Sequence, residues 1–184
     1  EDQARALELA TRLDELNRQR REIEEGMRAQ AEYLVERLTF RGDDLPAGLC
    51  LFGRGWHQGV SGILAARIRE RYHRPVVAFA EAGDGWLRGS ARSVEGLHIR
   101  DLIDGVDRRH PGLIERFGGH AMAAGLTLRA ESLPTFRAAF AAAARAELGD
   151  LPPERELQSD GELPPGLLGL EAADEDRRRG RVHR

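Results

Sequence analysis

The residues of this sequence that most clearly suggest a binding or catalytic role are two adjacent glycines followed by a histidine. They stand in the stretch Phe117-Gly-Gly-His-Ala-Met-Ala-Ala-Gly125. Gly118 and Gly119 can take positive φ angles and expose backbone N–H groups, so a phosphate can approach closely. His120 would then be the one large functional side chain on an otherwise bare surface. A tight turn with close backbone packing and a surface histidine is the alternative, and the nine residues alone leave both open.

A second candidate lies on an expected strand from Trp86 to Ser93. With a period of two, one face of this strand carries Trp86, Arg88, Ser90 and Arg92, and the other carries Leu87, Gly89, Ala91 and Ser93. Two arginines flanking a serine hydroxyl, with Gly89 alongside, would form a compact phosphate pocket, because arginine forms bidentate bonds to phosphate. The alternative is a solvated strand face with a turn serine.

A third candidate is the glycine-rich turn over 53–59, between an apolar run at 47–52 and an expected helix at 60–72. A strand that ends in a glycine turn and opens a helix places amide donors at the helix N-terminus, which suits anions. His57 and Gln58 lie beside this turn. An ordinary strand-to-helix connection, with Trp56 covering the core, is the alternative.

The sequence lacks the patterns of a complete hydrolytic site. Its histidines at 57, 98, 110 and 120 lie on separate expected elements, and no Asp/His cluster has the spacing of a two-metal site. There is no Walker-type loop, and no Ser-His-Asp set can be argued. Asp101, Asp104 and Asp107 form the polar face of one short helix. The sequence therefore predicts three phosphate-binding places, no metal site and no cofactor of its own.

One long amphipathic helix over residues 2–38 must position this domain relative to its surroundings. The segment contains no proline, and its leucines recur at steps of three and four. About 36 residues at ~1.5 Å each give roughly 54 Å, which is longer than a small domain is wide. Arg20 and Gln30 fall on the seam that a coiled-coil dimer would use. We therefore expect a helix that connects two lobes and packs partly on its own domain.

The rest of the chain alternates short apolar runs with helical patterns. We expect strands at 47–52, 75–80, 86–93 and 125–129, and helices at 60–72, 97–106, 111–117 and 133–148. This order predicts an α/β domain whose mixed β-sheet is flanked by helices and preceded by the long N-terminal helix. We expect the linker helix at 1–40, the domain at 41–149, an extended segment at 150–173 and a disordered charged tail at 174–184.

Composition excludes several classes. The chain has 184 residues and a net charge of −3, but residues 51–129 carry 12 arginines against 8 acidic residues, so an anion is expected there. Cys50 is the only cysteine and lies in an apolar run, which excludes a disulfide framework and predicts a buried thiol. No apolar run is long enough to span a membrane and no signal peptide opens the sequence, so a cytoplasmic location is expected by default. The first residue is Glu1, which suggests a fragment.

Three motifs in this order resemble a known family. Gly55-Trp-His-Gln-Gly-Val-x-Gly-Ile63, Gly89-Ser-Ala-Arg-Ser93 and Gly118-Gly-His-Ala-Met-Ala-Ala-Gly125 resemble the DHHA1 domain of DHH-family phosphoesterases, and more closely the RecJ single-stranded-DNA exonucleases. The resemblance covers about residues 5–170. It implies degradation of single-stranded DNA from the 5′ end, with divalent metal ions (Mg or Mn) held by an N-terminal DHH lobe. No Asp-His-His occurs in this sequence.

The resemblance also implies roles for individual residues. Ser90 and Arg92 would hold the terminal 5′ phosphate, and His120, with the amides of Gly118 and Gly119, would face the scissile phosphate in a supporting catalytic role. Further phosphate contacts and the lining of the groove are expected from Arg88, His57 and Gln58. The expected partners are single-stranded DNA and the DHH lobe of the same polypeptide. The isolated chain is expected to be monomeric and catalytically inactive, and it lacks the family's oligonucleotide-binding barrel.

Two other functions stay open at this point. The first is a DHHA1 lobe that acts on short oligonucleotides or cyclic dinucleotides. The second is a non-enzymatic interaction module that dimerises through residues 2–38.

Overall fold

The computed structural model of the protein describes residues 2–40 and 45–149. In chain order its elements are α1 (Asp2–Phe40), β1 (Leu49–Phe52), α2 (Gln58–Tyr72), β2 (Val76–Glu81), β3 (Trp86–Arg92), α3 (Ile99–Arg109), β4 (Arg116–Gly119), β5 (Ala123–Arg129), the 3-10 turn η1 (Ala130–Ser132) and α4 (Leu133–Leu148). The expected segments at 150–173 and 174–184 lie outside the described residues. None of the described helices is both long and apolar enough to cross a membrane.

The sheet has five strands in the order β1-β2-β3-β5-β4. β1 and β2 are parallel and are joined by α2, whereas the other neighbours are antiparallel. A parallel pair needs a crossover of this kind, while antiparallel strands are joined by short turns. The structure therefore confirms the α/β class, the mixed sheet and the long N-terminal helix.

The expected short helix at 111–117 is wrong. Gly112 has a φ of +81°, and the chain turns there before it enters β4. Glu115 donates its backbone N–H to the carbonyl of Thr127 at 2.9 Å, and Phe117 pairs with Leu126. Pairing with β5 therefore replaces the helical hydrogen bonds, and Gly118 and Gly119 lie within a strand instead of a loop.

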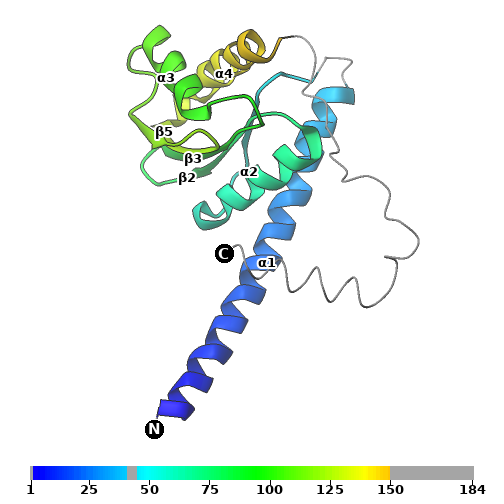
Figure 1. Cartoon of the computed structure of the whole chain (residues 1–184), viewed down its shortest axis with the longest axis vertical. Helices are drawn as coiled ribbons and strands as arrows, with labels where there is room; N and C mark the ends of the chain where they lie inside the picture. Colours follow the sequence, from blue (N-terminus) through cyan, green and yellow to red (C-terminus); the bar gives the residue numbers. More distant parts are fainter. Residues whose placement is uncertain (1, 41–44, 150–184) are drawn as a thin grey trace, which may run out of the picture. The chain divides into compact units, whose positions relative to one another are not determined.

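One face of the sheet is closed by helices α3 and α4 (Figure 1). Its core is built around Phe79 of β2 and two phenylalanines of α4 that have no exposed surface. Phe79 and Phe136 meet edge to face with ring centroids 5.5 Å apart, and Phe136 stacks on Phe140 at 5.7 Å. Close packing of large side chains makes this face the main source of apolar burial in the domain.

The other face is covered by α2, which lies over β2 and β3, and by the second half of α1, which packs on α2 and reaches β1. Met27, Ala31 and Val35 of α1 are buried in this second core. Trp56 is 4% exposed, and its indole N–H donates to Oε1 of Gln30 at 2.8 Å. Gln30, which lies on the seam that a coiled-coil dimer would use, therefore has a hydrogen-bond partner within its own domain.

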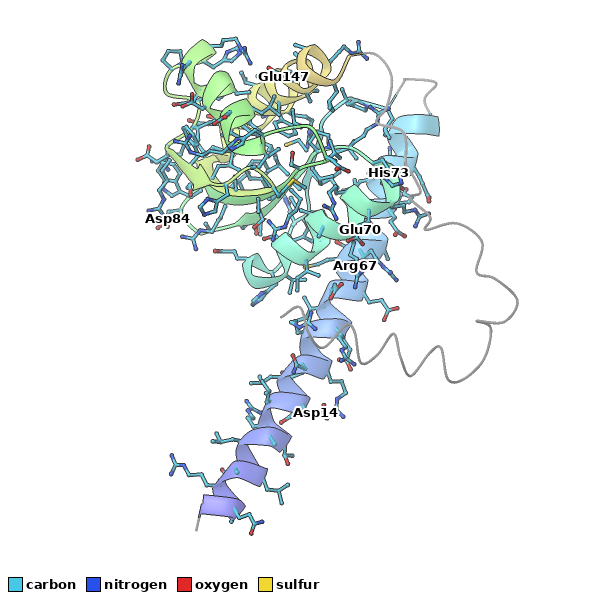
Figure 2. The ribbon with its side chains drawn as sticks, in the orientation of Figure 1. Asp14, Arg67, Glu70, His73, Asp84 and Glu147 are labelled. Carbon is cyan, nitrogen blue, oxygen red and sulfur yellow. The ribbon has the colours of Figure 1, made fainter. Side chains whose placement is uncertain are left out.

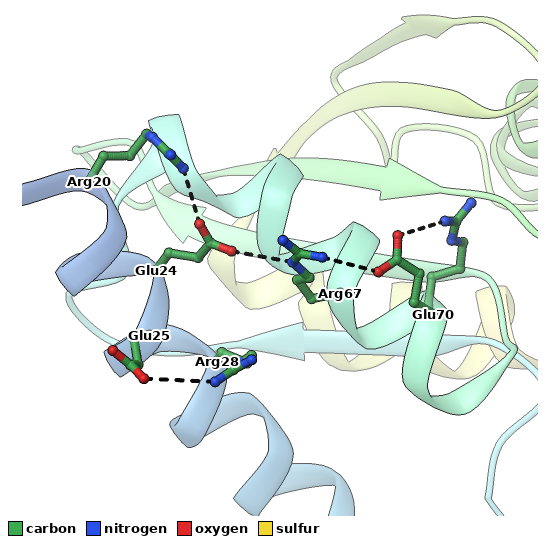
Figure 3. A network of polar contacts seen from close by, with 7 residues as sticks. Arg20, Glu24, Glu25, Arg28, Arg67 and Glu70 are labelled. Carbon is green, nitrogen blue, oxygen red and sulfur yellow. Dashed lines mark hydrogen bonds and ion pairs between the residues drawn. The ribbon is translucent and has the colours of Figure 1, made fainter. Parts of the chain in front are cut away.

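Ion pairs border the contact between α1 and α2. Glu24 accepts from Arg20 at 3.0 Å and from Arg67 of α2 at 3.5 Å, and Arg67 continues to Glu70 (Figure 3). Arg71 pairs with Glu32 at 2.7 Å. Arg67 and Glu70 lie on the part of α2 next to α1 (Figure 2). These contacts confirm that the second half of α1 packs on its own domain.

The first half of α1 has a different surface. Leu7, Leu9 and Leu13 are each at least 61% exposed, and Leu16 and Ile23 are also exposed. Asp14 lies on this half (Figure 2). The apolar stripe of the sequence pattern therefore continues past the residues that contact α2.

Candidate phosphate-binding site

The face of β3 that carries the arginines and the serine lies on the same side of the sheet as α2. Burial alternates along β3, with Leu87, Gly89 and Ala91 buried and with Arg88 exposed. Ser90 and Arg92 are half-buried on the same face as Arg88. The predicted period of two is confirmed.

The start of α2 lies directly against these residues. Ser61 Oγ is 3.3 Å from Ser90 Oγ, and it donates to the carbonyl of Gln58 at 2.7 Å. Arg88 donates to Gln58 Oε1 at 3.4 Å, while Gln58 Nε2 donates to the carbonyl of Glu81 at 2.8 Å. The glycine turn with its helix N-terminus and the Arg-Ser-Arg strand are therefore one site instead of two.

Gly62 allows Arg92 to lie close to α2. A Cβ atom at Gly62 would be 2.9 Å from Nη2 of Arg92 and 3.8 Å from Ser90 Oγ. Arg92 also donates from Nη1 to the carbonyl of Ala91 at 2.8 Å, which fixes the side chain along its own strand. A side chain at Gly62 would displace the guanidinium from Ser90, so this glycine shapes the pocket.

Ser61 is an unspecified position of the first motif, and Gly62 belongs to that motif without an expected role. They lie three and four residues after Gln58, which is the spacing that places side chains on one face of a helix. That spacing was a usable signal, but it could not show that this face meets β3.

His57 has a structural role at the beginning of α2. Its Nδ1 accepts the backbone N–H of Gly59 at 3.1 Å, so it caps the helix, and its side chain is exposed. An N-cap acceptor satisfies a backbone donor that would otherwise face solvent. The backbone N–H of His57 also points to the sulfur of Met27 on α1 at 3.4 Å. The expected role of His57 in lining the groove stays a prediction.

The glycine-histidine segment reaches the same face through the strand register. Ser90 pairs with Gly125, and Gly125 pairs with Gly118, so the three residues form a row across β3, β5 and β4. Directly opposed residues of antiparallel strands lie on the same face. Gly118 and Gly125 are both exposed, and they extend the surface beside Ser90 with bare backbone.

The two glycines before the histidine are not equivalent. Gly119 has a φ of +148°, and a Cβ there would lie 2.4 Å from the carbonyl oxygen of Ala123. Gly118 has no positive φ, and a Cβ there would meet nothing within 4 Å. The expectation of a left-handed backbone is therefore right for Gly119 and wrong for Gly118, which is in ordinary strand conformation.

His120 follows β4 and is exposed. Its backbone N–H donates to the carbonyl of Ala123 at 2.8 Å, and Ala123 is the residue that pairs with Arg92. His120 and Arg92 therefore lie at the same end of the β3–β5–β4 part of the sheet, and neither is buried in the apolar core.

The site has an uncompensated positive charge. In the part of the chain that the structure describes, neither Arg88 nor Arg92 forms an ion pair. Two guanidinium groups, the hydroxyl of Ser90 and the N-terminus of α2 favour an anion at Ser90. The arrangement can bind a phosphate.

The residues do not fit a catalytic metal centre. Within residues 2–40 and 45–149, no group of three or more His, Cys, Asp or Glu side chains could hold a metal ion.

Known proteins resemble this chain over its α/β domain and at least the end of α1. Residues 32–146 match the family described as the DHHA1 domain. The chain is 51% identical over 173 residues to the single-stranded-DNA-specific exonuclease RecJ of Dickeya dadantii, covering 94% of this chain and 30% of that protein. It is 48% identical over 165 residues to the RecJ of Escherichia coli, covering 90% of this chain and 29% of that protein.

A solved structure agrees with these sequences. The crystal structure of RecJ from Thermus thermophilus in complex with Mg²⁺ has a TM-score of 0.66 and 31% identity, over 85% of this chain and 23% of that one. The chain thus spans about 30% of the length of the curated relatives it matches.

Proposed function

This chain belongs to the DHHA1 domain family, as the DHHA1 domain of the RecJ exonuclease family, and we propose that it is the phosphate-binding lobe of a 5′→3′ single-stranded-DNA exonuclease. The observation that carries the proposal is the joining of the Arg-Ser-Arg face of β3 with the start of α2. Ser61 Oγ, Ser90 Oγ and the Arg92 guanidinium lie together there, without a carboxylate partner among the described residues.

We propose that this pocket holds the terminal 5′ phosphate. Arg92 would bind two phosphate oxygens, because its planar guanidinium suits bidentate contacts, and Ser90 would donate a third hydrogen bond. Arg88 and Gln58, at the open side of the pocket, would contact the first nucleotide. A charged contact of this kind distinguishes a phosphorylated end from a hydroxyl end.

We propose that the scissile phosphate lies over the glycine-histidine segment. Gly118 and Gly119 would allow the DNA backbone to come close, and His120 would support the reaction by facing that phosphate. His57 would line the groove through the part of its ring that does not cap α2.

The hydrolytic chemistry would come from divalent metal ions in a DHH lobe that this sequence does not contain. Metal ions in such a site would supply a nucleophilic hydroxide and stabilise the leaving oxygen. The residues of this chain would bind and orient the DNA strand opposite that lobe. The solved RecJ of Thermus thermophilus is a complex with Mg²⁺, which agrees with this division of labour.

The exposed apolar half of α1 supports the same arrangement. We propose that Leu9, Leu13 and Leu16, which share one face of α1, contact the DHH lobe of the same polypeptide, and that this chain alone is a monomer. A sedimentation experiment over a range of protein concentrations tests the second statement. A concentration-dependent dimer would favour a helix-mediated interaction module instead.

The end-recognition proposal is tested by comparing 5′-phosphorylated with 5′-hydroxyl oligonucleotides. Arg92→Ala is expected to reduce binding to the phosphorylated end by roughly tenfold or more, because a charge-assisted hydrogen bond is worth about 1.5–3 kcal/mol. Binding to the hydroxyl end should change much less. Arg109→Ala, on α3 at the other face, is the control for the loss of one positive charge.

Equal losses of affinity for both ends would remove Arg92 from end recognition. The purified chain should show no nuclease activity with Mg²⁺ or Mn²⁺. Metal-dependent cleavage that is lost in His120→Ala would contradict the assignment of the reaction to a second lobe.

A further inference from the structure

The face of the sheet that carries Ser90 and Arg92, called the open face from here on, extends from β3 across β5 to the edge strand β4. Arg88 pairs with Thr127 of β5, and Thr127 pairs with Arg116 of β4. These residues form a row parallel to the Ser90-Gly125-Gly118 row. Arg116 thus lies on the edge strand, about 10 Å from β3, because neighbouring strands are ~4.8 Å apart.

Arg116 is an exposed arginine held in place on this face. Its Nε donates to Thr127 Oγ1 at 3.4 Å, which leaves the terminal nitrogens of the guanidinium available. Arg116 forms no ion pair with any residue that the structure describes. By contrast, Arg100 and Arg108 of α3 pair with Asp101 and Asp104 of the same helix.

Another arginine of the open face is already engaged. The guanidinium of Arg129 lies 3.8 Å from the ring centroid of Trp86, and it donates to the carbonyl of Asp84 at 3.1 Å. Asp84 marks the turn between β2 and β3 (Figure 2). Arg129 therefore stabilises this hairpin, and Arg116 is the arginine whose charge faces outward beyond the pocket.

Among residues 2–40 and 45–149, no contact requires a glycine at the two positions between Ser90 and the edge of the sheet. A Cβ at Gly125 would meet nothing closer than the carbonyl oxygen of Gly89 at 3.9 Å, and a Cβ at Gly118 would meet nothing within 4 Å. Neither has a positive φ. Glycine weakens a strand, and one with no internal reason marks a place where another backbone approaches closely.

Gly89, by contrast, is a glycine that the packing of the domain requires. A Cβ there would lie 2.6 Å from the ring of Phe79 and 2.9 Å from Leu126, so packing on the closed face requires that glycine. The bare surface over Gly125 and Gly118 has no such cause. It leads from the Ser90 pocket to Arg116.

We infer that Arg116 binds an internal phosphate of the DNA strand beyond the scissile one, so that the strand crosses β5 and β4 over the two glycines and leaves the sheet at its edge. This inference rests on the proposed function, because it assumes that the first phosphate lies at Ser90 and Arg92. It differs from end recognition because Arg116 would contact the DNA backbone equally in strands with a 5′ phosphate and in strands with a 5′ hydroxyl.

The test measures binding of the 184-residue chain to fluorescent eight-residue thymidine oligonucleotides with a 5′ phosphate or a 5′ hydroxyl, over a range of salt concentrations. Arg116→Ala is expected to lower the affinity for both by the same factor, roughly tenfold at low salt. It should also reduce the slope of log K against log salt by about 0.7, the value for one phosphate contact on a single strand.

Two further variants make this test specific. Arg116→Lys should keep the salt slope while recovering only part of the affinity, because lysine keeps the charge but not the planar guanidinium. Arg109→Ala, with the same loss of charge on the opposite face, should leave both slope and affinity nearly unchanged. Since Arg116 is exposed, its replacement is expected to leave the thermal midpoint within about 1 °C of the unaltered chain.

The possible results separate the two proposals. If Arg116→Ala binds as tightly as the unaltered chain, or loses no more than Arg109→Ala, this inference is overturned while end recognition by Arg92 stands. If Arg116→Ala lowers only the affinity for the 5′-phosphorylated strand, Arg116 belongs to the end pocket and the internal contact is overturned. If only Arg92→Ala fails to act as expected, end recognition and the path that starts at Ser90 are overturned, and only a contact between Arg116 and the DNA backbone stands. An unaltered chain that binds neither oligonucleotide would overturn both.

Discussion

The two faces of the sheet differ in what covers them. On the closed face, α3 and α4 bury phenylalanines and leucines with almost no exposed surface. On the open face, α2 covers β2 and part of β3, while the residues of β5 and β4 that point to this side are exposed or half-buried. The same strands serve both faces, because successive side chains of a strand point in opposite directions.

The comparison shows how one sheet divides stability from binding. Leu126 and Leu128 of β5 are buried in the closed face, and the residues between them and beside them, Gly125 and Thr127, belong to the open one. A shift of one residue in the pairing of β5 would exchange these two sets. The apolar packing of one face therefore sets the register that brings Ser90, Gly125 and Gly118 into one row on the other.

The largest expected effect tests the closed face. Phe136→Ala removes a fully buried ring that contacts both Phe79 and Phe140. It should lower the free energy of unfolding by about 3–5 kcal/mol, the usual range for a buried Phe→Ala replacement. Arg88→Ala on the open face should cost less than about 0.5 kcal/mol, as exposed substitutions do. Urea denaturation of both variants measures the difference, and similar losses would contradict the division.

A pair of neighbouring glycines gives the next largest effect. Gly119→Ala places a Cβ against the Ala123 carbonyl at a positive φ, and it should destabilise the fold by about 1–3 kcal/mol. Gly118→Ala has open space and ordinary strand backbone, and it should stabilise the fold by up to about 0.5–1 kcal/mol while weakening DNA binding. Thermal denaturation with a binding assay checks both. A stabilised Gly118→Ala that binds normally would show that the open face needs no bare backbone.

A pH experiment tests how well the closed face excludes water. Burial raises the pKa of the Cys50 thiol to about 12, from an ordinary value of 9.0. Below pH 9 the thiol is protonated in both states. Above pH 9 only the unfolded chain ionises, so stability falls as the pH rises toward 12. Between pH 8 and pH 10 the loss due to Cys50 should be about 1.4 kcal/mol.

Replacing Cys50 measures how much of the pH dependence of stability is due to its thiol. Tyr72 also has a raised pKa, caused first by burial, so the unaltered chain has more than one alkaline transition. Cys50→Val should remove only the part of the pH dependence that belongs to the thiol. If the two chains lose stability in parallel up to pH 10, the closed face admits water at β1.

The smallest expected effect concerns the contact between α1 and α2. Arg67 is 56% exposed and joins Glu24 of α1 to Glu70 of α2. Because exposed ion pairs contribute little, Arg67→Ala should cost no more than about 1 kcal/mol. Gln30→Ala, which leaves the buried indole N–H of Trp56 without its acceptor, should cost about 1–3 kcal/mol. Chemical denaturation ranks the two, and a larger loss for Arg67→Ala would mean that ion pairs hold α1 in place.

Local sequence patterns were sufficient for most elements and for the alternation along β3. The leucine spacing of α1, the apolar runs of β1 and β2, and the alternation of Arg88, Ser90 and Arg92 are all confirmed. The short strand β4 was missed, because Phe117 is its only apolar residue and its hydrogen bonds come from a strand that follows it in the chain. A four-residue edge strand with two glycines has no periodic signal of its own.

The sequence by itself determined the residue types that can bind a phosphate and the elements that carry them, because periodicity and turn chemistry act over a few residues. Only the tertiary structure decided that the start of α2 and the face of β3 lie together, and that Gly125, Gly118 and Arg116 lie beside them on the same face. Those placements depend on strand register and on helix packing between residues that are distant in the sequence, such as Ser61 and Ser90, or Arg88 and Thr127. Such contacts are set by the burial of the closed face as a whole, and no local pattern contains them.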